Sequence, residues 1–280
     1  MDILAQTREL AKIFNINPTS SKGQNFLIDE SVYDSIIESA KIPHGATILE
    51  AGPGFGFLTA KLAESAEKVV AVELDDGLAG YLRTALDAAE AGNVDLVHAD
   101  VMSIDEDFLA DISPYQIVSN LPYQISSIFL RKFLTAKNKP ASLTLMLQKE
   151  VAERIVSKAP DMNLLAFSVQ YYATPRIEKI VPASSFWPKP KIDSAIIRID
   201  VDQERNISAE DERKLFRILK FAFSAKRKML KNNLSAGLHI DASVIENILD
   251  KNGFGVKSRA ENLDVDDWLK LFADLKPFVL

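Results

Sequence analysis

The sequence predicts an α/β protein with a second, smaller helical domain at its C-terminal end. Apolar runs alternate with amphipathic stretches between residues 47 and 199. The runs recur about 20 to 25 residues apart, which leaves room for the crossover helix that joins neighbouring parallel strands. The polar segment 200–206 then separates this pattern from a wholly helical one. These observations predict a parallel sheet with crossover helices, followed by a helical unit.

Six apolar segments are predicted strands, and amphipathic stretches between them are predicted helices. The strands are expected at Thr47–Glu50, Val69–Glu73, Asp95–His98, Gln116–Ser119, Ser142–Leu147 and Ala195–Ile199. The helices are expected near 57–66, 77–91, 124–136 and 148–158. Short apolar runs of this kind are typical of strands that are buried on both faces of a sheet.

The region after residue 206 reads as helical to the end of the chain. Ser208 is a predicted N-cap, because Asp211 and other acids follow it in the first turn. The predicted breaks between helices are Gly237, Gly253 and Gly255. We therefore expect one domain over residues 1–204 and a helical domain over 205–280.

The composition is that of a globular protein with an ordinary core. Hydrophobic residues make up 47% of the chain and charged residues 26%, and no apolar run approaches the roughly 18 residues of a membrane helix. The first residues lack the pattern of a secretory signal, so we expect a cytoplasmic protein. No pattern for association stands out, so the expected state is a monomer. Cysteine is absent and the histidines are widely spaced, which leaves no expected disulfide or metal site.

One segment departs strongly from the net charge of −6. Residues 213–231, called the basic segment below, contain eight lysines or arginines and no acid. Phosphate binding responds to local charge, so we interpret this segment as a phosphate-facing helical surface. The alternative is a solvated helix face, which the lack of interleaved acids disfavours. The candidate contacts are Arg213, Arg217, Lys220, Lys226, Arg227, Lys228 and Lys231.

A glycine loop follows the first predicted strand. Gly52, Gly54 and Gly56 lead into a helix, so the backbone can approach a ligand and offer N–H groups to it. No Gly-Lys-Ser or Gly-Lys-Thr follows, and Phe57 stands at the third glycine position of the dinucleotide fingerprint. A pyrophosphate is therefore a poor ligand and an unphosphorylated nucleoside a better one. The alternative is a purely structural turn.

Acids at the ends of the next two strands suit such a nucleoside. Glu73 ends the second strand, 21 residues after Gly52, where a carboxylate can accept hydrogen bonds from both ribose hydroxyls. Asp100 follows the third strand and can accept a hydrogen bond from an adenine amine. Because an acidic pocket also favours a sulfonium cation, the predicted cofactor is S-adenosylmethionine.

The segment Asn120-Leu121-Pro122-Tyr123 ends the fourth predicted strand. It sets polar groups and an aromatic ring at the edge of the sheet, which suits a planar base that carries an exocyclic amine. The alternative is a proline turn with Tyr123 packed on the core. The glycine loop and the two acids favour the base-binding interpretation.

Six segments, in order, resemble the motifs of a known family, the ribosomal RNA adenine N6-dimethyltransferases of the bacterial KsgA type. They are KGQNFL at 22–27, EAGPGFG at 50–56, VELD at 72–75, NLPY at 120–123, FWPKPKIDS at 186–194 and FSAKRKMLKNNL at 223–234. The resemblance runs through nearly the whole length of the chain, and six motifs in family order are highly specific.

The resemblance implies a Rossmann-like class I methyltransferase domain with a seven-stranded, mostly parallel sheet, and a helical, RNA-binding C-terminal domain. It implies dimethylation of two adjacent adenosines in the 3′-terminal hairpin loop of small-subunit rRNA, with the pre-assembled small ribosomal subunit as partner. By this carry-over, the residues that contact or border the cofactor are Asn25, Leu27, Gly52, Gly54, Glu73, Asp100 and Asn120. The expected catalytic residues are Asn120, Leu121, Pro122, Tyr123 and Phe186.

The expected chemistry is positioning of a weakly nucleophilic amine. The carbonyl of the Asn120 side chain and that of the Leu121 backbone accept its two N–H groups, and Pro122 fixes the direction of the second carbonyl. Tyr123 and Phe186 stack on the faces of the base. For Phe186 the alternative is a core aromatic ahead of a proline-rich turn.

The chain departs from the family pattern at three positions. Asp76 stands where relatives often carry a basic residue, Gln124 where many have asparagine, and Lys226 where arginine or glutamine is frequent. Three other functions remain to be weighed: a large-subunit rRNA adenine methyltransferase of the macrolide-resistance type, a ribosome-assembly factor that binds immature small subunits and for which catalysis is secondary, and an NAD-dependent oxidoreductase. Intact catalytic residues disfavour the second, and Phe57 disfavours the third.

Overall fold

The computed structural model describes residues 2–16, 25–202 and 207–279, and it divides into two compact units. Unit 1 comprises Met1–Glu153 and Ala173–Gln203, and unit 2 comprises Arg154–Tyr172 and Glu204–Leu280. Unit 2 includes 154–172, which the sequence analysis placed in the domain expected over residues 1–204. The apolar side chains of 154–172, among them Phe167, join the core of the C-terminal helices, which a contiguous boundary does not anticipate.

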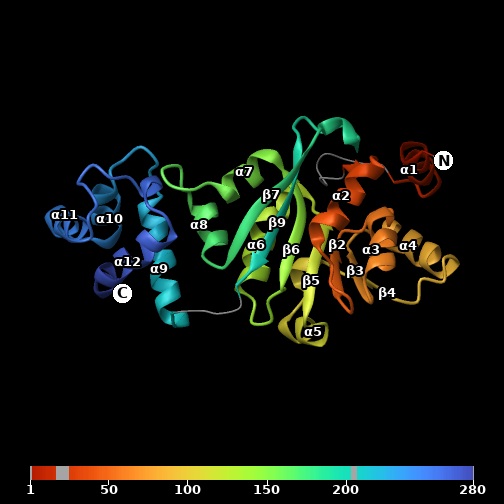
Figure 1. Cartoon of the computed structure of the whole chain (residues 1–280), viewed down its shortest axis with the longest axis horizontal. Coiled ribbons are helices and arrows are strands. Elements are labelled where there is room, and N and C mark those ends of the chain that lie inside the picture. Colours follow the sequence, from red (N-terminus) through yellow and green to blue (C-terminus); the bar gives the residue numbers. More distant parts are fainter. Residues whose placement is uncertain (1, 17–24, 203–206, 280) are drawn as a thin grey trace. The chain divides into compact units, whose positions relative to one another are not determined.

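Unit 1 is built on a seven-stranded, mostly parallel sheet (Figure 1). Its strands, in spatial order, are β4 (Val94–His98), β3 (Lys68–Glu73), β2 (Thr47–Ala51), β5 (Tyr115–Asn120), β6 (Ser142–Gln148), β9 (Ser194–Val201) and β7 (Ala173–Val181). The first five run parallel, and β9 pairs antiparallel with both β6 and β7. This is the sheet that the resemblance implied.

All six predicted strands are present, each within two residues of its expected ends. The pattern missed β7, because this edge strand carries a proline and several charged side chains, such as Arg176 and Glu178, instead of an apolar run. It also missed a two-stranded antiparallel sheet formed by β1 (Phe26–Leu27) and β8 (Phe186–Trp187), in which Leu27 lies opposite Phe186. Two-residue strands carry too little pattern to predict.

The four predicted helices of this region are also present. The helices of the α/β region are α1 (Ile3–Ile13), α2 (Glu30–Ala40), α3 (Phe57–Ser65), α4 (Asp76–Ala88), α5 (Glu106–Asp111), α6 (Ser126–Thr135) and α7 (Lys149–Val156). Asp29 caps α2 and Asp75 caps α4 by accepting backbone N–H bonds. Apolar residues of α2, including Ile36, pack on β6 and β9 in one core cluster with Phe186. No described helix is long and apolar enough to cross a membrane.

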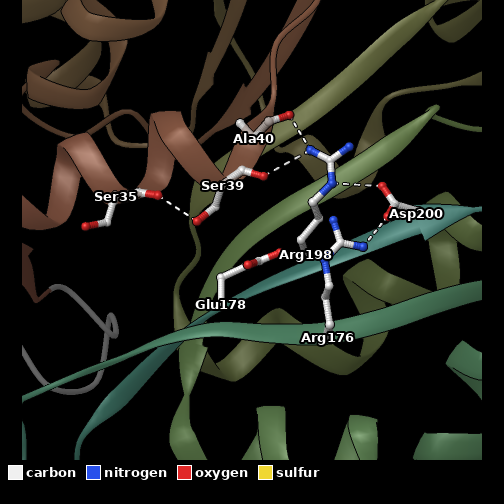
Figure 2. A network of polar contacts seen from close by, with 7 residues as sticks. All are labelled: Ser35, Ser39, Ala40, Arg176, Glu178, Arg198 and Asp200. Carbon is white, nitrogen blue, oxygen red and sulfur yellow. Dashed lines mark hydrogen bonds and ion pairs between the residues drawn. The ribbon is translucent and has the colours of Figure 1, made fainter.

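An arginine from the sheet fixes the C-terminal end of α2 (Figure 2). The guanidinium of Arg198, on β9, donates to the carbonyls of Ser39 and Ala40 in the last turn of the helix, and to the carboxylate of Asp200 at 2.8 Å. Asp200 also accepts from Arg176 on β7. Terminal helix carbonyls lack intrahelical partners and favour a cation, so this network ties α2 to the edge of the sheet.

Unit 2 is helical, as expected. Its helices α8 (Leu164–Gln170), α9 (Ala209–Ala222), α10 (Leu230–Leu238), α11 (Ala242–Lys251) and α12 (Val265–Leu275) enclose a core around Trp268. Ser208 caps α9 as predicted, and its side chain accepts from the N–H of Asp211. The prediction of a break at Gly237 was wrong: this residue lies inside α10, where an added Cβ would meet the Phe221 ring at 2.3 Å.

Candidate active site at the ends of β2, β3 and β5

The carboxyl ends of β2 and β5 lie side by side where the strand order of the sheet reverses. Ligands bind at this position in open α/β sheets, because the connections leave the two strands in opposite directions. The buried hydroxyl of Ser119, on β5, accepts from the N–H of Ala51 at 2.7 Å and donates to its carbonyl at 3.1 Å. This clamp holds the start of the glycine loop beside Asn120.

A cavity of about 490 Å³ opens at these strand ends. The predicted site residues that line it are Asn25, Leu27, Gly52, Gly54, Glu73, Asn120, Leu121, Pro122 and Tyr123. Its other lining residues include Glu50, Asp75 and Asp76, and no Lys, Arg or His is among the described residues that line it. Residues from four separate parts of the sequence therefore share one acidic cavity.

Hydrogen bonds within the protein hold the glycine loop in its conformation. Gly52, Gly54 and Gly56 all have positive φ angles, which other residues rarely adopt. The N–H of Gly52 donates to the carbonyl of Val72, and that of Gly54 donates to the Glu73 carboxylate at 3.1 Å. The expectation that this loop presents free N–H groups is wrong for these two glycines. The loop can still bring its backbone close to a ligand.

Glu73 lies where the sequence analysis expected it, at the end of β3. One carboxylate oxygen accepts from the N–H groups of Leu74 and Asp75, both at 2.8 Å, and the other accepts from Gly54. Burial raises the pKa of this carboxyl, while the three backbone donors oppose the rise. Since each carboxylate oxygen has two lone pairs, Oε1 is already saturated by its two donors, and Oε2 keeps capacity for one hydroxyl donor from a ligand.

Glu50, at the end of β2, is the most buried polar group of the cavity. Its side chain is 1% exposed, and its Oε2 has no hydrogen-bond partner among the residues that the structure describes. Burial raises the pKa of Glu50 to about 8; the hydroxyl of Thr59 opposes this rise, and the nearby Glu73 adds to it. Tyr33 of α2 also lines the cavity, and its hydroxyl donates to the Leu27 carbonyl at 2.8 Å. An unpaired buried oxygen is costly and is a natural acceptor for a ligand.

The Asn120–Tyr123 segment leaves β5 as a turn, and Pro122 begins a short 3₁₀ helix, Tyr123–Ile125. The side chain of Asn120 makes no hydrogen bond with any described residue, so its amide is available to a ligand. The Tyr123 hydroxyl lies 2.7 Å from that of Ser194, on β9. Burial raises the pKa of Tyr123, which therefore stays neutral. The bond to Ser194 anchors the ring at the cavity.

Two predicted site residues lie outside the cavity lining. Asp100 follows β4 as expected, but its exposed carboxylate accepts from the N–H of Met102 at 2.8 Å and caps a 3₁₀ turn. Phe186 is 2% exposed in the core beneath α2, so its ring is not available to stack on a base in this conformation. The alternative interpretation, a core aromatic ahead of a proline-rich turn, describes its position. Residues 22–24 of the KGQNFL motif lie outside the described residues.

The basic segment is in unit 2, and it is not one continuous helix. It covers most of α9, a turn over 223–229 and the start of α10. Six of its candidate residues are exposed: Arg213, Arg217, Lys220, Lys226, Arg227 and Lys228. Lys231, a candidate phosphate contact, is partly buried and its ammonium pairs with Glu246 of α11, so this lysine has an acidic partner inside the protein. Glu246 lies 15 residues after Lys231 in the sequence, so the pattern of the basic segment does not reveal this ion pair.

The sequence analysis assigned no role to three residues that the site uses. Glu50 is the orphan carboxylate, Leu74 is 65% exposed beside Glu73 in the cavity lining, and Ser194 anchors Tyr123. All three fall inside the quoted motifs, which was the available signal.

Comparison with known proteins identifies a family for this geometry. The family model described as ribosomal RNA adenine dimethylase matches residues 15–276. The chain is 38% identical over 270 residues to a ribosomal RNA small subunit methyltransferase A from Dehalococcoides mccartyi, covering 96% of this chain and 92% of the relative. It is 37% identical over 268 residues to the protein of the same name from Clostridium botulinum, covering 95% and 96%.

Solved structures agree in fold over most of the chain. A dimethyladenosine transferase from Plasmodium falciparum has a TM-score of 0.76 at 25% identity, covering 90% of this chain and 98% of the other. The 23S rRNA methyltransferase ErmE has a TM-score of 0.73 at 26% identity, covering 90% and 100%. The sheet is therefore Rossmann-like, and the chain belongs to the ribosomal RNA adenine dimethylase family of methyltransferases.

Proposed function

We propose that this protein transfers methyl groups from S-adenosylmethionine to the N6 amines of two adjacent adenosines in the 3′-terminal hairpin loop of small-subunit rRNA. The observation that carries the proposal is the joint position of Glu73 and the Asn120–Tyr123 segment on one acidic cavity. The curated relatives named small subunit methyltransferase A support the choice of the small subunit. We further propose that a monomer acts in the cytoplasm on a pre-assembled small subunit.

The residues of the cavity fit S-adenosylmethionine. This cofactor carries an activated methyl group on a sulfonium, and the lining holds four acidic side chains, of which Glu50 keeps its proton below about pH 8, with no basic residue among those described. Glu73 is the proposed partner of the ribose, and Leu74 offers an apolar surface beside it. Glu50 offers an unpaired buried acceptor that a donor from the ligand would satisfy. A Cβ on Gly54 would lie 3.4 Å from the Phe26 ring, so a side chain there would crowd the cavity wall.

The proposed chemistry is positioning of the adenine amine. The lone pair of that nitrogen is delocalised into the ring, so it attacks poorly until it becomes pyramidal. The Asn120 amide oxygen and the Leu121 backbone carbonyl accept its two N–H groups and thereby favour the pyramidal form. Pro122 holds φ near −56°, which fixes the Leu121 carbonyl. Orientation and electrostatics supply the rate, because the site needs no strong base before the amine is methylated.

Tyr123 is the proposed stacking surface for the target base. Its ring is held by the contact with Ser194 and lines the same cavity as Asn120. Phe186, by contrast, supports the cavity wall indirectly, because its strand β8 pairs with β1. For Phe186 to stack on the base, β8 would have to move away from its core position. The adenosine itself must leave its stack to reach the cavity, as loop residues do readily.

Labelled methyl transfer onto unmethylated particles tests the proposed function. Small subunits that lack the modification are incubated with the protein and labelled cofactor, beside large subunits and fully modified small subunits. The proposal expects label in the unmodified small subunits alone. Label in the large subunit would favour the alternative that ErmE represents, an enzyme acting on 23S rRNA.

The Asn120→Ala variant tests the proposed role of the amide. Its side chain makes no hydrogen bond with any described residue, so its removal should leave the fold intact. Methyl transfer should fall by at least about 10³-fold, since an acceptor that positions the nucleophile is lost. Cofactor affinity, measured by calorimetry, should stay within a few-fold of the wild-type value. Near-normal transfer by this variant would refute the role.

A further inference from the structure

Unit 2 contains a second cavity, of about 740 Å³, that the proposed function does not use. Three segments of unit 2 line it: the stretch 154–164 between α7 and α8, the end of α9 with the turn after it, and residues 260–261. All of its lining residues belong to unit 2. The basic segment supplies only part of the wall, so a sequence pattern alone does not reveal this site.

Side-chain amides hold the walls of the second cavity in place. Asn163 donates to the carbonyl of Arg154 at 2.9 Å, and Gln170 donates to those of Ile155 and Ser157, both at 2.8 Å. On the opposite wall the buried Asn233 donates to the carbonyls of Ala222 and Ala225. The cavity is therefore pre-formed, which lowers the entropy cost of binding.

The charged groups of the second cavity favour an anion. Arg154, Lys220 and Lys226 are exposed, and none forms an ion pair with a residue that the structure describes. Two acids also line it, and one of them, Glu261, lies 3.5 Å from Arg259. The other, Asp161, is exposed. Unpaired cations from separate segments, with one compensated acid, suit a phosphate diester better than a cation.

An aromatic ring completes the site. Phe223 lines the cavity and is only partly buried, with its ring centroid 5.8 Å from that of Trp268. The contact with Trp268 restricts the ring of Phe223, which makes it a rigid surface for a nucleic-acid base. Pairing of cations with an accessible aromatic ring is the usual composition of sites for single-stranded RNA.

We infer that the second cavity binds one nucleotide of the substrate RNA, with its phosphate on Arg154, Lys220 and Lys226 and its base on Phe223. The identity of that RNA rests on the proposed function. The inference extends RNA contact beyond the basic segment to Arg154, on the far side of the cavity. It also gives unit 2 a defined nucleotide site in place of a diffuse basic surface.

Two variants in the same stretch of chain test the inference. Arg154→Gln removes a cation that lines the cavity, and Lys158→Gln removes an exposed cation four residues away that does not line it. Fluorescence anisotropy of the full-length protein is measured against salt, with the 3′-terminal hairpin RNA and with an unrelated single-stranded RNA. Arg154→Gln should weaken binding of both RNAs and lower the slope of log affinity against log salt by about 0.7 to 0.9, the value of one phosphate contact. Lys158→Gln should leave the slope near that of the wild type.

A third variant should change RNA affinity in the opposite direction. Asp161→Asn removes the exposed carboxylate of the second cavity and should tighten RNA binding. Cofactor affinity should be unchanged in all three variants, which verifies that each is folded. Equal effects of Arg154→Gln and Lys158→Gln, weaker binding by Asp161→Asn, or no RNA binding at all would overturn the inference.

The outcome is separable from that of the proposed function. If no methyl group reaches small subunits while binding of the unrelated RNA still depends on Arg154, the proposed function fails and the nucleotide site stands. If methyl transfer proceeds normally and Arg154→Gln binds RNA with the wild-type slope, the proposed function stands and the nucleotide site is refuted.

Discussion

At the residue scale, the cavity is defined by carboxylates that the fold buries at a cost. Glu73 meets three backbone donors, which offsets part of that cost, whereas Glu50 keeps one oxygen without a described partner. The position of Glu50 inside the EAGPGFG motif was evident from the sequence. Its isolation was not, because burial depends on how α2, β2 and β3 pack around it.

Glu50 should make the stability of the ligand-free protein fall as the pH rises. Its pKa in the folded protein is raised from 4.5 to about 8, so the folded state keeps a proton that the unfolded chain loses. The free energy of unfolding should therefore drop between about pH 4.5 and pH 8, by about 1.4 kcal/mol per pH unit where the difference is complete. Urea denaturation at several pH values measures this. Glu50→Gln should make the slope shallower, with the raised pKa of Glu73 accounting for what remains, whereas the exposed Glu9→Gln should retain the wild-type slope; an unchanged slope in Glu50→Gln would contradict the assignment.

At the element scale, helices and strands with a clear apolar period could be predicted, and those defined by tertiary partners could not. β7 is an edge strand with a polar composition, and β8 is too short to show a period. The basic segment appeared helical throughout, because lysine and arginine are good helix formers. The turn at 223–229 is instead set by Asn233 of α10, whose side-chain amide donates to the carbonyls of Ala222 and Ala225.

Arg198 should be a principal support of α2. The glutamine side chain of Arg198→Gln is too short to reach Ser39, Ala40 and Asp200 together, so the carbonyls of the last turn of α2 lose their donor. We expect a loss of about 2 to 4 kcal/mol in the free energy of unfolding. Lys179→Gln, which removes an exposed bond to Ser35, is the matched control and should cost under about 0.5 kcal/mol. Comparable losses in the two variants would show that the network does not hold the helix.

Two helical glycines should respond to alanine with opposite signs. In α10, a Cβ on Gly237 would lie 2.3 Å from the Phe221 ring, so Gly237→Ala should destabilise by about 1 to 3 kcal/mol. In α4, Gly80 has nothing within 4 Å of the same position, so Gly80→Ala should stabilise by about 0.5 to 1 kcal/mol. Thermal and urea denaturation compare the two. A stable Gly237→Ala variant would mean that α9 and α10 are not in close contact there.

At the scale of the whole molecule, the parallel sheet explains why motifs far apart in the sequence meet. The ends of β2, β3 and β5 deliver the glycine loop, Glu73 and Asn120 to one edge, and the seven-stranded, mostly parallel sheet could be anticipated from the family resemblance. The positions of Asp100 and Phe186 relative to the cavity could not, because they depend on the 3₁₀ turn at Val101–Ser103 and on the pairing of β8 with β1. Nor could the assignment of 154–172 to unit 2, which follows from apolar packing.

The most direct test of the central claim is to map the product. Unmodified small subunits are incubated with the protein and S-adenosylmethionine, and the rRNA is digested and analysed by mass spectrometry. We predict N6,N6-dimethyladenosine at two adjacent adenosines of the 3′-terminal hairpin loop, and none with Asn120→Ala. Dimethylation confined to large-subunit rRNA, or unmodified adenosines in the hairpin, would contradict the account.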